Sequence, residues 1–243
     1  MNRDNFDISQ VTVIIPAYNP SEAILEVVDG VLSHGFTDII IVNDGSKKEK
    51  LPLFDCIAKK SGDGIGIRVL NHKRNMGKGA ALKTGFRYFI KNRGNQSGIV
   101  TVDDDGQHLP CDIKKCAIAM IKSGVMVLGQ RDFGKAGVPK KSLIGNSIMA
   151  SAFKLFTGLK LADTQTGLRA IPRAYIPKLT TLPGNRYDYE TIMLAAAKHE
   201  NWGIKKVKIE TVYIDGNKRS NYRALTDSAI IFARMIKYLL LKQ

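Results

Sequence analysis

"GIVTVDDDGQHLP", residues 98–110, joins a short apolar run to three consecutive carboxylates. The apolar residues 98–102 are typical of a buried strand, and the segment Cys111–Ser123 that follows has the length of a helix. The stretch therefore predicts a strand, a polar turn and a helix. Asp103, Asp104 and Asp105 lie in that turn, although the chain as a whole carries an excess of positive charge. Three negative charges at the end of a buried strand need a chemical reason.

The same alternation of strand and helix runs through the first half of the chain, where short β-branched runs precede segments of helix length. It predicts an α/β fold with a mostly parallel central sheet and helices on both faces. After Gly158 the rhythm loosens into a strand at 166–171, a helix at 189–199 and an alternating strand at 205–214, which we interpret as a mixed C-terminal extension. The earlier predicted strands are 11–15, 38–43, 66–71, 98–102 and 125–129, and the predicted helices are 21–33, 47–60, 78–92, 111–123 and 142–156.

The composition narrows the class of protein and of partner. The 243 residues include 37 Lys and Arg against 22 Asp and Glu, a net charge of +15, which favours an anionic partner such as nucleic acid, anionic lipid or a phosphorylated substrate. Three cysteines without zinc or redox spacing argue against a disulfide framework and favour a reducing cytoplasm. The first ten residues lack the apolar core of a signal peptide. No apolar stretch reaches the about 20 residues that cross a bilayer.

The C-terminal segment 225–241 has apolar residues at helical spacing, interrupted by Arg234 and Lys237. We expect an amphipathic helix, which either packs on the domain or lies on a membrane surface. Neither a repeat nor a linker interrupts 1–243, so we expect a single domain.

Polar, glycine-containing sequences follow each of the first four predicted strands: "PAYN", "NDGS", "NHKRNMGKGAA" and "DDDGQH". In open parallel sheets, ligands bind outside the carboxyl ends of the strands. The four clusters therefore predict one ligand site at that edge.

The acidic cluster suits a hard divalent cation, Mg²⁺ or Mn²⁺, which is usually held by one or two carboxylates together with substrate phosphates. In an extended backbone, Asp103 and Asp105 project to the same side and Gln107 can join them. Asp104 then points the other way, toward a ribose or a backbone group. The alternative is an acidic turn closed by a side-chain hydrogen bond to the backbone.

The loop "RNMGKGAALKTG", residues 74–85, does not fit the P-loop pattern, and no G-x-G-x-x-G follows the first strand. Gly77 and Gly79 can still let backbone amides approach an anion at the start of a helix, with Lys78 as a point charge. The alternative is a flexible lead into that helix.

Six blocks, "VTVIIPAYNP", "IIIVNDGS", "NMGKGAALKTG", "VTVDDDGQHLP", "LGQRDF" and "DTQTGLRAI", occur in the order and spacing of the family 2 inverting glycosyltransferases. The chain most resembles the branch of dolichol-phosphate mannose synthases and polyprenyl-phosphate sugar transferases, over roughly residues 11–213. The resemblance implies a GT-A fold with a nucleotide-donor half at 11–130 and an acceptor half at 131–243. It also implies transfer of a sugar from a UDP- or GDP-sugar to a polyprenyl-phosphate-type acceptor, with Mg²⁺ or Mn²⁺.

The resemblance also assigns roles to individual residues. Asp44 would accept a hydrogen bond from the donor base, and Arg131 would face the donor diphosphate or the incoming phosphate. The implied metal ligands are Asp103, Asp105 and Gln107. The block 163–169 would line the acceptor side. The implied donor-binding residues are Pro16, Tyr18, Asn19, Asp44, Lys78, Asp103 and Asp104; the catalytic ones are Asp105, Arg131 and Glu190; and the acceptor-binding ones are Arg169, Lys218, Arg219 and Arg223.

Two departures from the family pattern bear on these roles. Pro20 stands where the family often has an acidic residue, and "DGNKRSNYRA", residues 215–224, does not reproduce the late R-x-x-G-x-S-K pattern. For Arg131 and Arg169 the alternative is a structural ion pair. His108 could reach the metal, or it could be a hydrogen-bonded loop histidine.

The acceptor decides whether a base is needed. A hydroxyl must lose a proton as it attacks, and Asp188 and Glu190 in "YDYE" are the candidate bases. A phosphate monoester, with its second pKa near ~6, is already largely dianionic and needs cations around it. The basic run 218–223 favours the phosphate acceptor.

Three other functions compete with this one. Transfer to a saccharide hydroxyl in surface-polysaccharide assembly keeps the donor chemistry. A sugar nucleotidylyltransferase would need a Gly- and Arg-rich loop after the first strand, and "PAYNPSEA" has none. A nucleic-acid-binding protein fits the charge but not the scattered basic residues, so we expect no nucleic-acid partner. We expect peripheral association with the cytoplasmic face of an anionic membrane, by the basic surface, the C-terminal helix or an integral-membrane partner protein.

Overall fold

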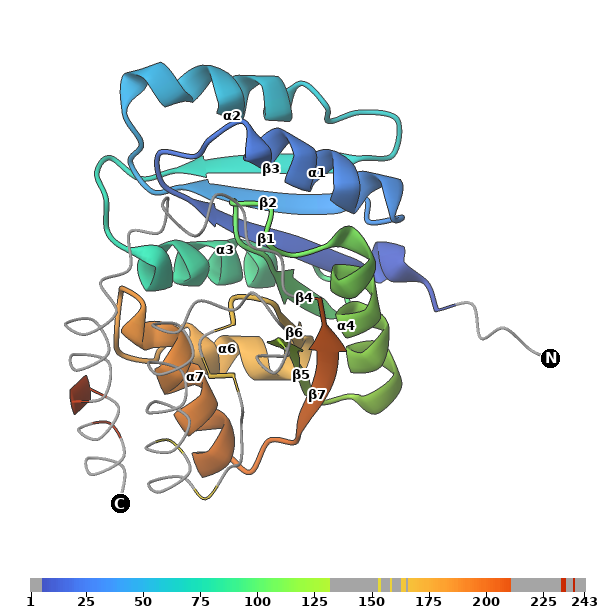
Figure 1. The fold of residues 1–243 in the computed structure, drawn as a ribbon, viewed down its shortest axis with the longest axis vertical. Coiled ribbons are helices and arrows are strands. Elements are labelled where there is room, and N and C mark those ends of the chain that lie inside the picture. The colour runs from blue at the N-terminus through green and yellow to red at the C-terminus, as the bar shows by residue number, and fades with distance from the viewer. Residues whose placement is uncertain are drawn as a thin grey trace.

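The computed structural model describes residues 6–131, 153, 158, 163–164, 166–210, 233–234 and 238. Within them, seven strands form one sheet in the order β3-β2-β1-β4-β6-β5-β7 (Figure 1). Most neighbours are parallel, and β6 alone runs antiparallel to both of its neighbours, β4 and β5. The α/β class and the mixed C-terminal part are therefore confirmed. The strands are β1 (Val11–Ala17), β2 (Asp38–Asn43), β3 (Gly66–Asn71), β4 (Gly98–Thr101), β5 (Met126–Arg131), β6 (Arg169–Pro172) and β7 (Ile204–Ile209).

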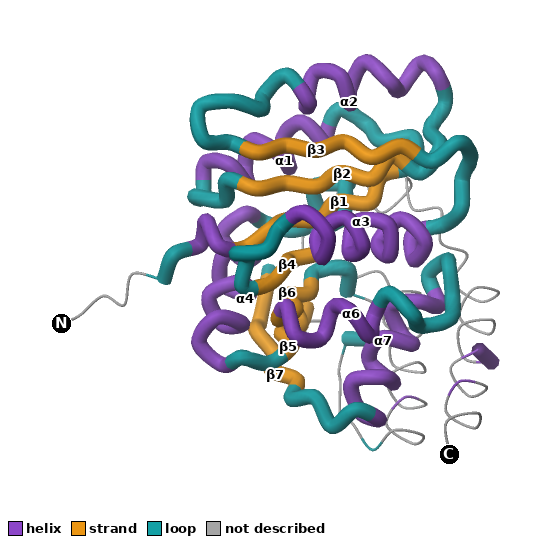
Figure 2. The backbone as a smooth tube through the Cα atoms, turned by 180° about the vertical axis from the view of Figure 1, so that it is seen from behind, coloured by secondary structure: helices purple, strands orange, loops and turns teal. Residues whose placement is uncertain are grey.

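Helices cover both faces of the sheet (Figures 1 and 2). Because successive side chains on a strand point to opposite faces, Ile14 packs with α3, α6 and α7, whereas Val13 and Ile15 pack with α1, α2 and α4. All three side chains are fully buried. The helices are α1 (Ala23–Ser33), α2 (Leu51–Ala58), α3 (Lys78–Asn92), α4 (Pro110–Ser123), α6 (Ile176–Leu179) and α7 (Asp188–His199), and the 3-10 turns are η1 (Ile8–Gln10), η2 (Lys48–Lys50) and η3 (Arg173–Tyr175).

The predicted bounds of β2, β3 and α3 are those observed. The predicted helix 47–60 is instead a 3-10 turn followed by α2, because Pro52 fits only the first turn of a helix. The predicted helix 142–156, apart from Phe153, lies outside the described residues, as does most of 225–241. Residues 211–214 of the last predicted strand lie there too. Among the helices that the structure describes, none has the length and apolarity needed to cross a bilayer.

Strand register brings distant segments to one edge of the sheet. The last residues of β1, β2 and β3 pair with one another, Ala17 with Asn43 and Asn43 with Asn71. Thr101, the last residue of β4, pairs with Arg169, the first residue of the antiparallel β6. The segment before β6 therefore meets the loops that follow β1–β4, although more than sixty residues separate it from β4.

Candidate active site

The turn after β4 holds the three carboxylates. The backbone leaves the extended conformation at Asp104 and Asp105, and Gly106 has a φ of +80°. The Gln107 amide donates to Asp105 Oδ1 at 3.0 Å. The hydrogen bond from backbone to side chain that is typical of an acidic turn is thus present. The sequence predicted that extended backbone would carry Gln107 to the side of Asp103 and Asp105, whereas in the structure a turn separates Gln107 from Asp103.

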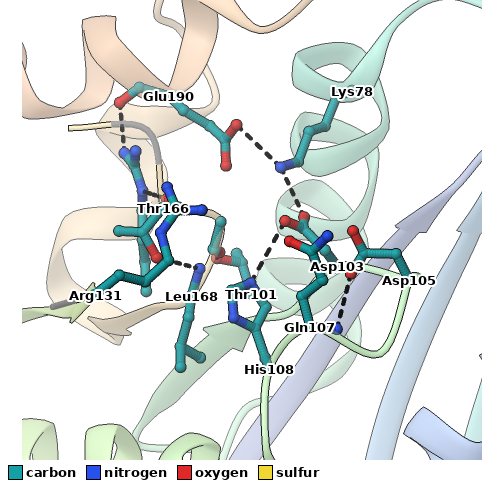
Figure 3. Close-up of polar contacts among 12 residues, drawn as sticks. Lys78, Thr101, Asp103, Asp105, Gln107, His108, Arg131, Thr166, Leu168 and Glu190 are labelled. Atoms are coloured by element: carbon teal, nitrogen blue, oxygen red, sulfur yellow. Dashed lines mark hydrogen bonds and ion pairs between the residues drawn. The ribbon is translucent and has the colours of Figure 1, made fainter. Parts of the chain in front are cut away.

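Lys78 joins this turn to the other side of the site. Its Nζ lies 2.7 Å from Asp103 Oδ1 and 3.0 Å from Glu190 Oε2 (Figure 3). Lys78 begins α3, and Glu190 lies in the first turn of α7. The three side chains are only 18%, 27% and 6% exposed for Lys78, Asp103 and Glu190 respectively, so the ion pairs are weakly screened by solvent.

Two glycines allow this approach of α3 to α7. A Cβ at Gly77, which has a φ of +98°, would lie 2.3 Å from the Asn185 carbonyl oxygen. A Cβ at Gly79 would lie 2.4 Å from Tyr189 Cβ. The Ala80 amide donates to the same Asn185 oxygen at 3.0 Å. These glycines therefore serve helix packing, and the amides of Gly77 and Ala80 already have protein partners rather than facing a free anion site.

Charge crowding shifts the acidities of the cluster. Burial lowers the pKa of Lys78, but the carboxylates of Asp103 and Glu190 outweigh it and hold that pKa well above its ordinary value. Burial raises the pKa of Asp103, and Lys78 and His108 reverse this to a net lowering. Burial and then the charges of Asp103 and Asp105 raise the pKa of Asp104 to about 7. Burial, followed by the charge of Asp103, also raises the pKa of Asp105.

Two buried side chains in the site have polar atoms without a hydrogen-bond partner among the described residues, Glu190 Oε1 and His108 Nδ1. His108 Nε2 lies 3.4 Å from Asp103 Oδ2, and its side chain is 5% exposed. Buried polar atoms normally have partners, so these orphaned atoms point to a ligand or water at this place.

The cluster has the donor chemistry for a hard divalent cation. Asp103, Asp105 and Gln107 offer carboxylate and amide oxygens, and among the described residues the ammonium group of Lys78 is the one placed against Asp103. Within the described part of the chain, no set of three or more His, Cys, Asp or Glu side chains converges as a complete metal cage. One or two carboxylates are enough where substrate phosphates complete the coordination, so the residues fit such an ion.

The segment before β6 packs directly on Asp103. A Cβ at Gly167 would lie 2.3 Å from Asp103 Oδ2, and Thr101 Oγ1 donates to the Gly167 carbonyl at 2.7 Å. Arg131, at the end of β5, donates to both carboxylate oxygens of Asp163, at 2.6 and 3.1 Å. The ion pair considered as the alternative for Arg131 is therefore present, although its side chain remains 23% exposed at the site edge.

Arg169 lies in the interior of the protein. It is fully buried and donates to the carbonyls of Thr166 at 3.1 Å, Thr164 at 3.3 Å and Glu190. Burial lowers its pKa below the ordinary value, and the nearby acids oppose this. In this conformation its donors hold the segment before β6 against α7, and the contact with an acceptor that the resemblance implied for Arg169 stays a prediction.

Asp44, predicted to contact the donor base, is bonded within the protein in this conformation. Its Oδ1 accepts from the Met76 amide at 2.9 Å and lies 2.6 Å from His72 Nδ1, while Oδ2 accepts from the Gly77 amide at 2.7 Å. Its side chain is 3% exposed, so a donor base does not reach it in this conformation. Asp44 fixes the loop that leads to Lys78. Sequence reasoning missed His72, because nothing in its neighbourhood signals a partner 28 residues away.

The remaining predicted donor residues lie at the same edge of the sheet. Tyr18 is 39% exposed, whereas Pro16 is buried within β1. The Asn19 amide donates to Ser46 Oγ at 2.9 Å, and Asn19 Oδ1 accepts from the Lys47 amide at 2.8 Å, so the loops after β1 and β2 are tied together. The predicted acceptor residues Lys218, Arg219 and Arg223 lie outside the described residues.

Comparison with known proteins agrees with this geometry. Residues 12–179 match the family described as glycosyl transferase family 2. The UDP-N-acetylglucosamine–dolichyl-phosphate N-acetylglucosaminyltransferase of Methanococcus voltae is 29% identical over 84% of this chain and 86% of its own length. The dolichyl-phosphate β-glucosyltransferase of Dictyostelium discoideum is 28% identical over 98% of this chain and 78% of its own.

Among solved structures, glucosyl-3-phosphoglycerate synthase from Mycobacterium tuberculosis, in complex with Mn²⁺, UDP-glucose and phosphoglyceric acid, superposes with a TM-score of 0.66. It is 18% identical, and the match covers 96% of this chain and 79% of that one. At that identity the likeness shows the fold, which is of the GT-A type predicted from the sequence.

Proposed function

The chain belongs to glycosyltransferase family 2, and from that membership we propose that it moves a sugar from a UDP- or GDP-sugar to a polyprenyl-phosphate-type lipid acceptor with the help of Mg²⁺ or Mn²⁺. The acidic turn bonded to Lys78 carries the proposal, because it gathers carboxylate and amide oxygens at the edge of the sheet where ligands of open parallel sheets bind. The relatives named as dolichyl-phosphate transferases support the acceptor class. The Mn²⁺ and UDP-glucose in the M. tuberculosis complex support the donor and the cation.

In this proposal the donor lies across the carboxyl edge of β1–β4. Tyr18 and Asn19 contact the nucleotide, and Asp104 faces the ribose. Asp103, Asp105 and Gln107 hold the cation, which would neutralise the charge that develops on the departing diphosphate. Lys78 adds a positive charge that is already fixed between two carboxylates.

Arg131 lies beside the same diphosphate while Asp163 orients its guanidinium. A guanidinium suits phosphate oxygens, because it presents several N–H donors in a fixed, planar arrangement. The acceptor approaches from the side of α7, and we assign Lys218, Arg219 and Arg223 to its phosphate on the sequence alone.

A second candidate is transfer to a saccharide hydroxyl. Glu190 Oε1, which is buried and has no hydrogen-bond partner in the described part of the chain, favours it, because a hydroxyl nucleophile needs a carboxylate within reach to accept its proton. Under the first proposal, the same oxygen has no proton to accept.

The proposed function is tested with a panel of UDP- and GDP-sugars, with and without Mn²⁺, against a polyprenyl phosphate and against a free glycan. We expect radiolabelled sugar in an acid-labile lipid fraction, dependent on the cation. Asp105→Ala should reduce transfer by about a thousandfold, as loss of a group that stabilises transition-state charge does. Label in the glycan instead of the lipid would establish the second candidate, and cation-independent transfer would refute the assigned role of Asp105.

For location we propose peripheral contact with the cytoplasmic face of a membrane, with or without an integral-membrane partner protein. The net charge of +15 supports this, because each cation close to an anionic leaflet contributes about 1 kcal/mol.

A further inference from the structure

Both oxygens of the Asp103 carboxylate have close neighbours in the protein. Oδ1 lies 2.7 Å from Lys78 Nζ, and Oδ2 lies 3.4 Å from His108 Nε2. The backbone of Gly167 also closes the Oδ2 side, since a Cβ there would lie 2.3 Å from that oxygen. A cation that binds Asp103 must therefore share or take over the oxygen that Lys78 now holds.

We propose that Lys78 is an internal counter-ion that competes with the divalent cation for Asp103, and that Glu190 holds the Lys78 ammonium while the cation is bound. This inference rests on the proposed function, because it takes Asp103 as a ligand of that cation. It goes beyond that function, because competition between Lys78 and the cation for Asp103 would control when the cation binds.

The geometry of Glu190 supplies the second position for the ammonium. Lys78 already contacts Glu190 Oε2 at 3.0 Å, and Oε1 of the same carboxylate is buried without a hydrogen-bond partner among the described residues. An ammonium has three donors and a flexible stem, so Lys78 can leave Asp103 and bind both oxygens of Glu190. The backbone of Glu190 stays in place, because Arg169 donates to its carbonyl.

This competition has a consequence for the order of binding. Without donor, the cation must displace a charge-assisted hydrogen bond in a partly buried site, so the free protein binds it weakly. A donor brings two phosphates that add ligands for the cation and offset the cost of moving Lys78. The cation is therefore held mainly together with the nucleotide.

The experiment measures Mn²⁺ binding by electron paramagnetic resonance with no nucleotide present. Lys78→Gln should tighten Mn²⁺ binding by about 10-fold or more, or about 1.4 kcal/mol, because the cation no longer displaces a hydrogen bond between two charged groups. The matched control is Arg186→Gln, which removes an equal charge from an exposed residue next to Gly77 and should change the affinity less than about twofold.

Glu190→Gln should weaken Mn²⁺ binding by about threefold or more, because Lys78 then loses its second carboxylate and stays on Asp103. In the Lys78→Gln background, the same Glu190 change should have little effect, since a double-mutant cycle isolates what Glu190 does through Lys78. Circular dichroism and thermal unfolding establish that each variant is folded. If Lys78→Gln does not fold, the single Glu190→Gln change still tests the proposal.

Unchanged or weaker Mn²⁺ binding by Lys78→Gln overturns the proposal, as does an equal gain in Arg186→Gln, which would make the effect one of net charge. Glu190→Gln that binds Mn²⁺ as tightly as the parent overturns it too. These outcomes are separate from failure of the proposed function, which would appear as absence of sugar transfer from every donor. A parent and a Lys78→Gln variant that both fail to bind Mn²⁺ would overturn the proposal as well.

Discussion

Two strands of the sheet, β2 and β4 on either side of β1, are followed by carboxylates that have opposite surroundings. Asp44, after β2, is surrounded by donors: two backbone amides and the His72 ring contact its oxygens at 2.6–2.9 Å. Asp104, after β4, lies between two other carboxylates, and its pKa is raised to about 7 by burial and by those charges. One carboxylate is stabilised by the fold, and the other is destabilised by it.

The difference separates an acid that is held by the fold from acids that we propose to be functional. Backbone amides that are fixed by the fold satisfy the hydrogen-bonding capacity of a carboxylate, so its oxygens are not available to a ligand. Crowded carboxylates instead repel one another, and a bound cation reduces this repulsion. Groups with strongly shifted pKa values are frequent at functional sites for that reason. Position after a strand is common to both acids and does not distinguish them.

The largest effect should come from the same chemical change made at both strand ends. Asp44→Asn should lower the free energy of unfolding by about 2–4 kcal/mol, because an amide cannot replace the charged acceptor of two backbone amides. Asp105→Asn should change that free energy by less than about 1 kcal/mol, since the Asn oxygen can still accept from the Gln107 amide. Denaturant unfolding in metal-free buffer measures both.

The comparison breaks if Asp44→Asn keeps the stability of the parent and instead abolishes binding of the nucleotide. Asp44 would then contact the donor base, as the family resemblance implied, and the loop after β3 would move on binding.

A smaller effect is expected where the segment before β6 supports the acidic turn. In Gly167→Ala, the new Cβ would lie 2.3 Å from Asp103 Oδ2, and the bond from Thr101 Oγ1 to the Gly167 carbonyl resists movement of the backbone. The Asp103 carboxylate should shift instead, which should reduce sugar transfer about 10- to 100-fold and lower the free energy of unfolding by about 1–3 kcal/mol. Transfer assays and denaturant unfolding measure these changes.

The matched control is Gly94→Ala, at an exposed turn where a Cβ meets nothing within 4 Å. It should leave both quantities close to those of the parent. Gly167→Ala with full activity would show that Asp103 tolerates displacement and is not held for binding.

Most of the fold was predictable because its elements are local. The apolar run 98–102 predicts a strand, and the spacing of apolar residues in 78–92 predicts a helix. The alternation of strands with helices along the chain predicts a mostly parallel sheet. The antiparallel direction of β6 was less accessible. It is a property of the pairing of β6 with β4 and β5, and the sequence of residues 166–171 indicates a strand without indicating its direction.

The sequence predicted which residues belong to the candidate site better than it predicted the contacts that these residues make. The turn 103–107 and Lys78 stand in recognisable blocks, so the sequence named them. The burial of Arg169 and the engagement of Asp44 by backbone amides depend on residues far away in the chain. The sequence around a charged residue does not indicate whether its side chain faces solvent or a backbone group. The contacts of Arg169 and Asp44 could therefore be found only from the structure.

The smallest effect concerns pH and tests the crowding directly. The pKa of Asp104 is about 7 in the folded protein and about 3.9 in an unfolded chain, so the folded state binds more protons between these values. Stability should therefore fall as the pH rises from about 4 to 7 and then level off. Because Asp104 is partly exposed, we expect Asp104→Asn to remove about 1 kcal/mol of that fall.

Denaturant unfolding at pH 5 and pH 8, with a chelator present, measures this difference. Asp55→Asn, an exposed change on α2, serves as the control and should leave the slope as it is in the parent. The parent should lose more stability between the two pH values than Asp104→Asn does, since only the parent must ionise a carboxyl between Asp103 and Asp105. Equal losses in both would mean that the acids after β4 are as well accommodated as Asp44, and the contrast between the two strand ends would disappear.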